Sequence, residues 1–222
     1  MKPELLAIEC HELPAFNTGS LDDVRRAFHS ATPCFLRQAW LKHAEADFAP
    51  GIVRLVRLGE SLLVFAELTD TDIFSNATKF NQRLWELGDS FEIFLRPIEQ
   101  EAYVEFQVSP DNQRLQLRYP DAAALGRARD SGSIEEVLVP DKIFHSNTWV
   151  RPQERKWFVL VDIPAASVRS ETRSLPGDHW HFSFSRYDYT CGRQEPVISS
   201  TSPHIEANFH RQQEWGAIRF QP

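Results

Sequence analysis

Cysteine is scarce in this chain of 222 residues, which contains only Cys10, Cys34 and Cys191. An odd number of widely separated cysteines does not make a disulfide framework, and their spacing is not that of a zinc site. Free cysteines usually behave as small apolar side chains and are buried. We therefore expect three buried free thiols, and a fold that is held together by its core.

Clustered positive charge and long apolar runs are also lacking. The formal net charge is −7 and the arginines are scattered, whereas a nucleic-acid surface needs clustered Lys and Arg. No stretch approaches the roughly 20 apolar residues that span a bilayer. Nucleic acid and membrane are therefore not expected as partners.

The first 16 residues, broken by Pro3 and Pro14, lack the apolar core of a signal peptide. If Met1 is the true start the protein is expected in the cytoplasm, and if the N-terminus is trimmed it is expected to be secreted.

Several catalytic signatures are absent as well. The chain has no Gly-rich phosphate loop, no GxSxG elbow and no CxxC pair, so nucleotide, esterase and redox functions have no support. The only methionine is Met1, which excludes haem ligation by a Met–His pair.

Short segments of alternating hydrophobicity are what the sequence does contain. From Gly51 onward the apolar period is two, and about ten short strands separated by turn signals follow. A helical pattern is confined to short stretches such as Ser20–Phe28, where Ser20 is a good N-cap. The expected fold class is all-β, an antiparallel β-sandwich of the immunoglobulin or jelly-roll kind with one or two short helices. We expect one domain over residues 1–222, on which residues 1–50 pack as an N-terminal extension. Residues 121–132 are predicted to be a mobile loop, and 134–140 an edge strand.

Three of the predicted strands, 91–96, 103–109 and 179–186, combine an apolar face with a polar one. Side chains alternate between the two faces of a strand. The polar faces carry Glu92, then Tyr103, Glu105 and Gln107, then His179, His181, Ser183 and Ser185. If the strands are neighbours, these groups form one patch. The patch is either the solvated side of a sheet or a surface that recognises hydroxyl groups.

An aromatic platform is available beside this patch. Trp85 directly precedes the first of the strands, and Tyr187 and Tyr189 follow the third. An aromatic ring can cover the C–H face of a sugar, although Trp85 can equally pack on the rim of the sandwich.

Six segments, taken in order, resemble the family 9 carbohydrate-binding modules and their relatives in the DOMON-type sandwich superfamily. They cover most of the chain from about residue 50 onward, and they are VRLVRLGESLLVFAELTDTDI, LWELGDSFEIFL, YVEFQVSPDN, KWFVLVDIP, WHFSFSRYD and NFHRQQEWGAIRF. The resemblance implies a non-catalytic sandwich that binds the end of a glucan or xylan chain, often beside a glycoside hydrolase. We therefore expect a saccharide ligand, a role in carbohydrate catabolism and association with a glycoside hydrolase.

The resemblance also implies a site in which two aromatics enclose a sugar ring with help from Glu, Arg and Asn or Gln. Trp85 matches the first aromatic, and Glu92 matches the Glu with one extra residue between them. Gln107 stands where binders tend to have Arg, Ser185 stands about where Asn is expected, and Tyr187 is nearest to the second aromatic. The expected ligand-binding residues are Trp85, Glu92, Gln107, His181, Ser185 and Tyr187.

Some members of that family bind structural calcium. The oxygens here could come from Asp70 and Asp72, or from Asp111 and Asn112, although all four are also ordinary turn residues. No other cofactor is expected.

Three further functions stay open. His179 and His181 share a strand face with cupin-like metal-site spacing, to which Glu92 or Glu105 could add a carboxylate, but the Glu that normally follows the histidines is missing. Glu92 and Glu105 could instead be the carboxylate pair of a glycoside hydrolase, whose members stand about 5–10 Å apart. An exposed edge such as 134–140 could pair with another protein chain.

Overall fold

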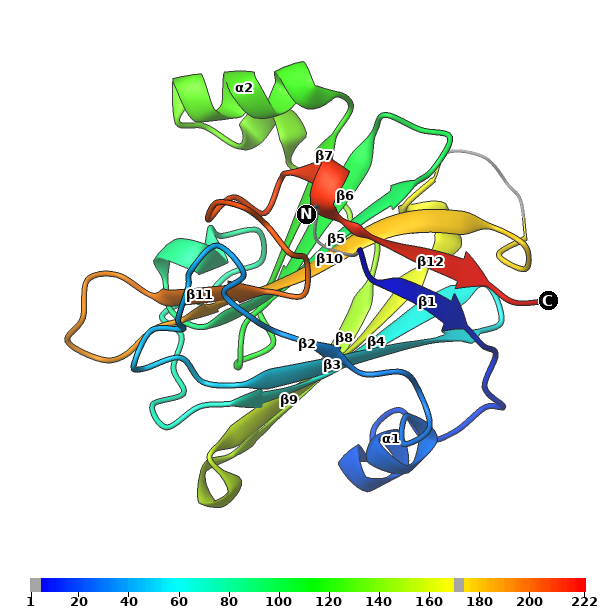
Figure 1. The fold of residues 1–222 in the computed structure, drawn as a ribbon, viewed down its shortest axis with the longest axis horizontal. Helices are drawn as coiled ribbons and strands as arrows, with labels where there is room; N and C mark the ends of the chain where they lie inside the picture. Colours follow the sequence, from blue (N-terminus) through cyan, green and yellow to red (C-terminus); the bar gives the residue numbers. More distant parts are fainter. Residues whose placement is uncertain (1–4, 170–173) are drawn as a thin grey trace.

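Two β-sheets lie face to face in the computed structural model, which describes residues 5–169 and 174–222. Helix α1 (Leu21–Ala27) lies against the outer face of one sheet and helix α2 (Ala122–Ser131) against the outer face of the other (Figure 1). Neither helix is long enough to cross a membrane, and no other described helix is. Short 3-10 turns complete the structure at η1 (Leu84–Glu86), η2 (Glu135–Val137), η3 (Pro152–Glu154), η4 (Ala165–Ser167) and η5 (Gln212–Glu214).

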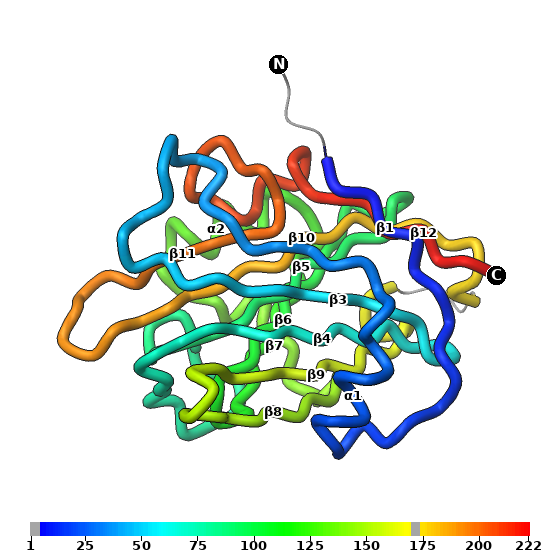
Figure 2. Tube along the Cα trace, turned by 60° about the horizontal axis from the view of Figure 1, so that its bottom comes forward, coloured from blue at the N-terminus to red at the C-terminus, as the bar shows by residue number. Residues whose placement is uncertain are grey.

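The larger sheet, sheet A, carries the predicted polar patch. Its strand order is β1-β12-β10-β5-β6-β7, and β11 also pairs with β10. All pairings within it are antiparallel except that of β1 with β12, which lie side by side at one edge (Figure 2). The strands are β1 (Ala7–Cys10), β5 (Ser90–Pro97), β6 (Tyr103–Val108), β7 (Arg114–Tyr119), β10 (His179–Asp188), β11 (Val197–Ser200) and β12 (Gly216–Phe220).

The smaller sheet, sheet B, has the order β2-β3-β4-β9-β8 and is antiparallel throughout. Its strands are β2 (Cys34–Phe35), β3 (Gly51–Leu58), β4 (Ser61–Thr69), β8 (His145–Arg151) and β9 (Lys156–Pro164). Residues 1–50 therefore supply one strand to each sheet as well as α1. The expected antiparallel β-sandwich with short helices is confirmed.

The core between the sheets contains the apolar sets that the alternation predicts. Phe91, Ile93 and Leu95 of β5 are fully buried, as are their counterparts on β6 and β10. They pack against the inner face of sheet B in one cluster. Burial of this apolar area, at about 25 cal/mol per Å², fixes which face of each strand points inward. The remaining side chains of β5, β6 and β10 must then lie on the outer face of sheet A.

The register of sheet A brings the polar side chains of these strands into rows. Ser185 of β10 pairs with Glu92 of β5, and Glu92 pairs with Gln107 of β6. In the next row Phe94 lies between Ser183 and Glu105. The three strands are therefore immediate neighbours, as the merged patch requires.

The outer face of sheet A is covered, which the sequence did not indicate. Helix α2 and the segments before β5 and β12 pack over Phe94, Leu115 and Leu117 in a second apolar cluster. The predicted loop 121–132 is wrong, because Asp121 caps a helix by accepting a hydrogen bond from the Ala124 backbone N–H (2.8 Å), and Gly132 ends it in the left-handed conformation (φ 65°).

Two smaller expectations are also corrected. Residues 134–140 contain the 3-10 turn η2, with a single bridge from Leu138 to Leu117, and are not an edge strand. Cys10 and Cys34 are buried free thiols as expected, whereas Cys191 is exposed.

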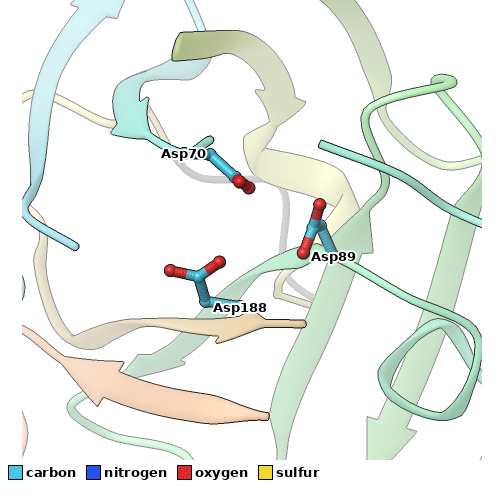
Figure 3. A group of neighbouring side chains, drawn as sticks. All are labelled: Asp70, Asp89 and Asp188. Carbon is cyan, nitrogen blue, oxygen red and sulfur yellow. The ribbon is translucent and has the colours of Figure 1, made fainter. Parts of the chain in front are cut away.

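A buried ionic cluster joins the two sheets at one end. Arg186 of β10 donates to the Thr69 carbonyl (2.6 Å) and to Asp70 (2.8 Å), both at the end of β4, and also pairs with Asp188 (3.1 Å). Asp89, at the start of β5, accepts hydrogen bonds from the backbone N–H groups of Phe74 and Tyr189 (both 2.8 Å). Figure 3 shows the carboxylates of Asp70, Asp89 and Asp188 converging, and their oxygens lie within 4.8 Å of one another.

We expect Arg186→Met to lower the free energy of unfolding by about 3–5 kcal/mol, because it leaves buried carboxylates without their counter-charge. Urea unfolding measures this change. Arg26→Met, which removes a side chain that is 78 % exposed and paired with Asp23, is the matched control and should leave stability within experimental error. Equal stability of the two variants would show that the cluster does not hold the sheets together.

We also expect stability to fall as the pH rises from about 4, near the pKa of an unfolded Asp, to about 8. Burial, with the charge of Asp70, raises the pKa of Asp89 to about 8, and burial raises the pKa of Asp188 to about 7. A carboxyl with a raised pKa binds its proton more tightly in the folded state than in the unfolded state. Each such carboxyl therefore lowers the free energy of unfolding by up to about 1.4 kcal/mol for every pH unit of increase. Asp89→Asn should flatten the profile of melting temperature against pH, and an unchanged slope would contradict this.

Candidate functional site

A cleft of about 630 Å³ opens on the outer face of sheet A. Its floor is formed by β5, β6 and β7, and its walls by α2, by η1 and by residues 206–210. This volume is in the range of small-molecule sites. The lining residues include Trp85, Glu92, Phe94, Glu105, Tyr119, Arg129, Tyr187, Asn208, Phe209 and His210.

The floor of the cleft is acidic. Glu92 and Glu105 are 2 % and 4 % exposed, and both accept hydrogen bonds from the same nitrogen, Gln107 Nε2, at 2.7 and 2.5 Å. The Tyr119 hydroxyl donates to the second oxygen of Glu105 at 3.3 Å. Burial, and the neighbouring Glu105, raise the pKa of Glu92 well above its ordinary value. Burial raises the pKa of Glu105 to about 7.

Neutral aromatic and imidazole groups surround this pair. The Tyr103 hydroxyl lies 2.8 Å from His210 Nδ1, while His210 Nε2 is 3.7 Å from Glu105. Burial lowers the pKa of His210 to about 3, so the ring is neutral at physiological pH. Burial also raises the pKa values of Tyr103 and Tyr119, which therefore stay protonated.

Two half-buried aromatics, Trp85 and Tyr187, line the cleft. Trp85 lies on η1, and its carbonyl accepts a hydrogen bond from the Tyr189 hydroxyl at 2.5 Å. Gly88 follows with φ 137°, and a Cβ there would come within 2.7 Å of the Phe74 carbonyl oxygen. Only glycine suits that position. The Tyr189 backbone N–H donates to Asp89, so the ionic cluster and the Trp85 turn are part of one connected structure.

Tyr187 is held by contact with Phe209. Its ring meets that of Phe209 edge to face, with centroids 5.9 Å apart, and Phe209 also packs against Trp40 and Phe94. Aromatic pairs of this geometry are attractive and limit ring movement. The two aromatics therefore present firm apolar surface beside an acidic floor.

Sequence reasoning missed the residues that close the cleft. Arg129 of α2 donates to Asn208 Oδ1 at 3.0 Å across its mouth. The helix was missed because a run rich in Ala was assigned to a loop, although Asp121 and Gly132 are helix-capping signals at its ends. Residues 206–210 show no strand-like or helical pattern of apolar residues. The family resemblance covers part of them, because its last matching segment begins at Asn208.

The six predicted ligand-binding residues are divided by the structure. Trp85, Glu92 and Tyr187 line the cleft. Gln107 is fully buried and bridges the two acids from within the sheet. Ser185 is also fully buried, and its hydroxyl donates to Ser200 Oγ at 3.2 Å. His181 pairs with Arg96 on β5 and does not line the cleft.

The cupin-like metal site is not assembled. His181 is four residues along β10 from the partner of Glu92, which corresponds to about 13 Å, and His179 is exposed. Within the described parts of the chain, the one group of three side chains placed to hold a metal ion is Asp70, Asp89 and Asp188.

Carboxylate oxygens of this kind are suited to Ca²⁺, but Arg186 already supplies a positive charge to two of the three aspartates. Of the pairs expected to supply calcium ligands, Asp70 Oδ1 and Asp72 Oδ2 accept backbone N–H groups (2.8 and 2.6 Å). Asn112 Oδ1 accepts from Ser146 at 2.5 Å. The observed hydrogen bonds therefore fit a cluster compensated by arginine better than one built around calcium.

Comparison with known proteins rests on structure. Neither the scan of protein-family models nor the search of curated proteins gives a match to this chain. The fold is similar to that of a candidate carbohydrate-binding protein from Bacteroides uniformis, with a TM-score of 0.75 and 16 % identity over 98 % of this chain and 100 % of that one.

It is also similar to a family 9 carbohydrate-binding module from Caldicellulosiruptor kristjanssonii, solved with cellotriose and with glucose. The TM-score is 0.63 in both comparisons, with 16 % and 15 % identity over 97 % of this chain and 93 % and 95 % of those chains. At this level of identity the similarity concerns the fold. The chain therefore has the β-sandwich fold of the family 9 carbohydrate-binding modules.

Proposed function

We propose that the protein is a non-catalytic module that binds a saccharide in the cleft on sheet A. The observation that carries this proposal is a cleft of about 630 Å³ that combines two aromatics with a buried acidic floor. The backbone of Trp85 is held by Tyr189, and the ring of Tyr187 packs against Phe209. Apolar walls with a few fixed polar groups are typical of small-molecule sites. The fold shared with modules solved with cellotriose and glucose supports a sugar as the small molecule.

Each part of the cleft has a role in this proposal. Trp85 and Tyr187 cover the C–H faces of the ring and exclude water from it. Glu92 and Glu105 accept hydrogen bonds from hydroxyl groups, and Gln107 holds both carboxylates in place from below. Arg129 at the mouth can donate to sugar oxygens.

A glucan- or xylan-type saccharide is the proposed ligand class. The sequence resemblance implies it, and the sugars bound in the two structures of the similar module are glucose and a glucose trimer. Association with a glycoside hydrolase and a role in carbohydrate catabolism are proposed with it. Both follow from the resemblance of the sequence.

Glycoside hydrolysis is a second candidate, because the cleft contains two buried acids and burial raises the pKa of both. However, both accept hydrogen bonds from one amide nitrogen in the floor, whereas a hydrolase places its acids on the two sides of the scissile bond. The geometry therefore favours binding. Release of a chromophore from an aryl glycoside by the wild type, and its loss in Glu92→Gln, would reverse this order.

We expect Trp85→Ala to weaken saccharide binding at least about tenfold, or 1.4 kcal/mol, because it removes one wall of the cleft. Calorimetry with glucose and cello-oligosaccharides measures the loss. Trp149→Ala is the matched control, since Trp149 is also a half-buried tryptophan but packs against the α1 cluster on the other sheet. A melting temperature that collapses in Trp85→Ala and not in the control would show that Trp85 belongs to the core.

We further propose that the fold does not depend on bound calcium, because Arg186 supplies the positive charge of the aspartate cluster. Addition of a chelator should leave the melting temperature of the wild type unchanged, and added calcium should not raise it. A stabilisation that grows with calcium concentration, as mass action requires of a ligand bound only to the folded state, would show that calcium binds.

A further inference from the structure

The floor of the cleft lacks positive charge, and we propose that the ligand supplies it. Within the proposed saccharide-binding function, the inferred ligand is an amino sugar with a free ammonium group, and its receptor is the Glu92–Glu105 pair. The inference depends on the saccharide-binding function, and it specifies which class of sugar the cleft prefers.

The floor offers acceptors and almost no donors. Glu92 receives one hydrogen bond, from Gln107, and forms no ion pair with any described residue. Glu105 receives hydrogen bonds from Gln107 and Tyr119. Gln107 does not line the cleft, and its Oε1 is fully buried beneath the floor without a hydrogen-bond partner in the described structure. Rotating the amide by 180° would point that oxygen at the two acids, which is favourable only when one of them carries a proton to donate to it.

An ammonium group matches this arrangement. It has three N–H donors and one positive charge and no acceptor. A hydroxyl group donates one hydrogen bond and supplies no charge, so it leaves the second carboxylate uncompensated. Burial and the closeness of the two acids favour a proton on the pair. An ammonium between them supplies positive charge in place of that proton and forms charge-assisted hydrogen bonds to both carboxylates.

The groups that face the pair do not supply this charge themselves. The titratable and charged residues around it are Tyr187 of β10, Tyr103 of β6, Tyr119 of β7, Arg129 of α2 and His210. The tyrosines and the histidine are neutral at physiological pH for the reasons given above, and burial keeps Tyr187 protonated as well. Arg129 is exposed, donates to Asn208 and acts on Glu105 from a distance.

Charges at the mouth of the cleft are paired, except that of Arg129, whose hydrogen bond goes to the neutral amide of Asn208. Arg83 contacts Glu86 at 3.2 Å, and Glu206 contacts Arg211 at 2.7 Å. The chain as a whole is negative, with a formal charge of −7, which favours the approach of a cation over that of an anion. The unmatched negative charge is therefore local to the Glu92–Glu105 pair.

Calorimetry of the full chain at about pH 7 with D-glucosamine, D-glucose and N-acetyl-D-glucosamine tests the inference. We expect glucosamine to bind at least about tenfold more tightly than the two neutral sugars. Glu92→Gln should abolish this preference while glucose binding changes less. Glu154→Gln, which removes a charge from the sheet B side of the molecule, is the matched control and should keep the preference.

The pH dependence provides a second test that needs no variant. Glucosamine affinity of the wild type should rise as the pH increases toward about 7, because Glu105, whose pKa burial raises to about 7, ionises as this pH is approached while the amine stays mostly charged. If the pair instead held a proton and donated it to a sugar hydroxyl, affinity would fall over the same range.

Two results would overturn the inference. Equal affinity for glucose and glucosamine would refute it and leave the proposed saccharide-binding function intact. Absence of binding to all three sugars and to cello-oligosaccharides would refute the proposed function, and the inference with it.

Discussion

The contact between Arg186 and the end of β4 is the interaction on which the rest of the structure depends. Its fully buried guanidinium joins sheet A to sheet B through Thr69 and Asp70 and compensates the carboxylates gathered there. Asp89 in that cluster holds the backbone of Tyr189, whose hydroxyl in turn holds the Trp85 carbonyl. A buried arginine is costly to desolvate. Here it is retained at the point where both sheets and the aromatic wall of the cleft meet.

The molecule contains two groups of buried carboxylates that differ in how their charge is balanced. In the aspartate cluster the Arg186 guanidinium lies within hydrogen-bonding distance of Asp70 and Asp188, and these carboxylates do not line the cleft. In the Glu92–Glu105 pair the bridging group is a neutral amide, and the group opens into a cleft. Burial raises pKa values in both. Arg186 neutralises its carboxylates and so suits a contact between two sheets. The neutral amide of Gln107 does not neutralise Glu92 and Glu105, which can therefore still accept hydrogen bonds from a ligand.

The alternation of apolar residues was sufficient to predict the sandwich and the inward faces of β5, β6 and β10, because burial of one strand face leaves little freedom of register. It also placed Glu92, Gln107 and Ser185 on one face of the sheet, while their alignment in one row is set by the register of the strands. It could not show that Gln107 and Ser185 lie beneath the surface, since their burial depends on segments far away in sequence. His181 was grouped with them because it shares their face, but it lies too far along the strand. Helix α2 and Phe209, which turn the face into a cleft, carry no period-two signal.

This covering of sheet A explains why the site is acidic and enclosed. An open sheet face would leave Glu92 and Glu105 in water, where both would ionise and bind sugars weakly against competing solvent. Helix α2 and residues 206–210 cover much of that face but leave a cleft, which Trp85 and Tyr187 line. Desolvation strengthens hydrogen bonds to the remaining acceptors, and it raises the cost of leaving them unpaired. The same enclosure that forms the cleft therefore makes the floor selective for a ligand that brings donors and positive charge.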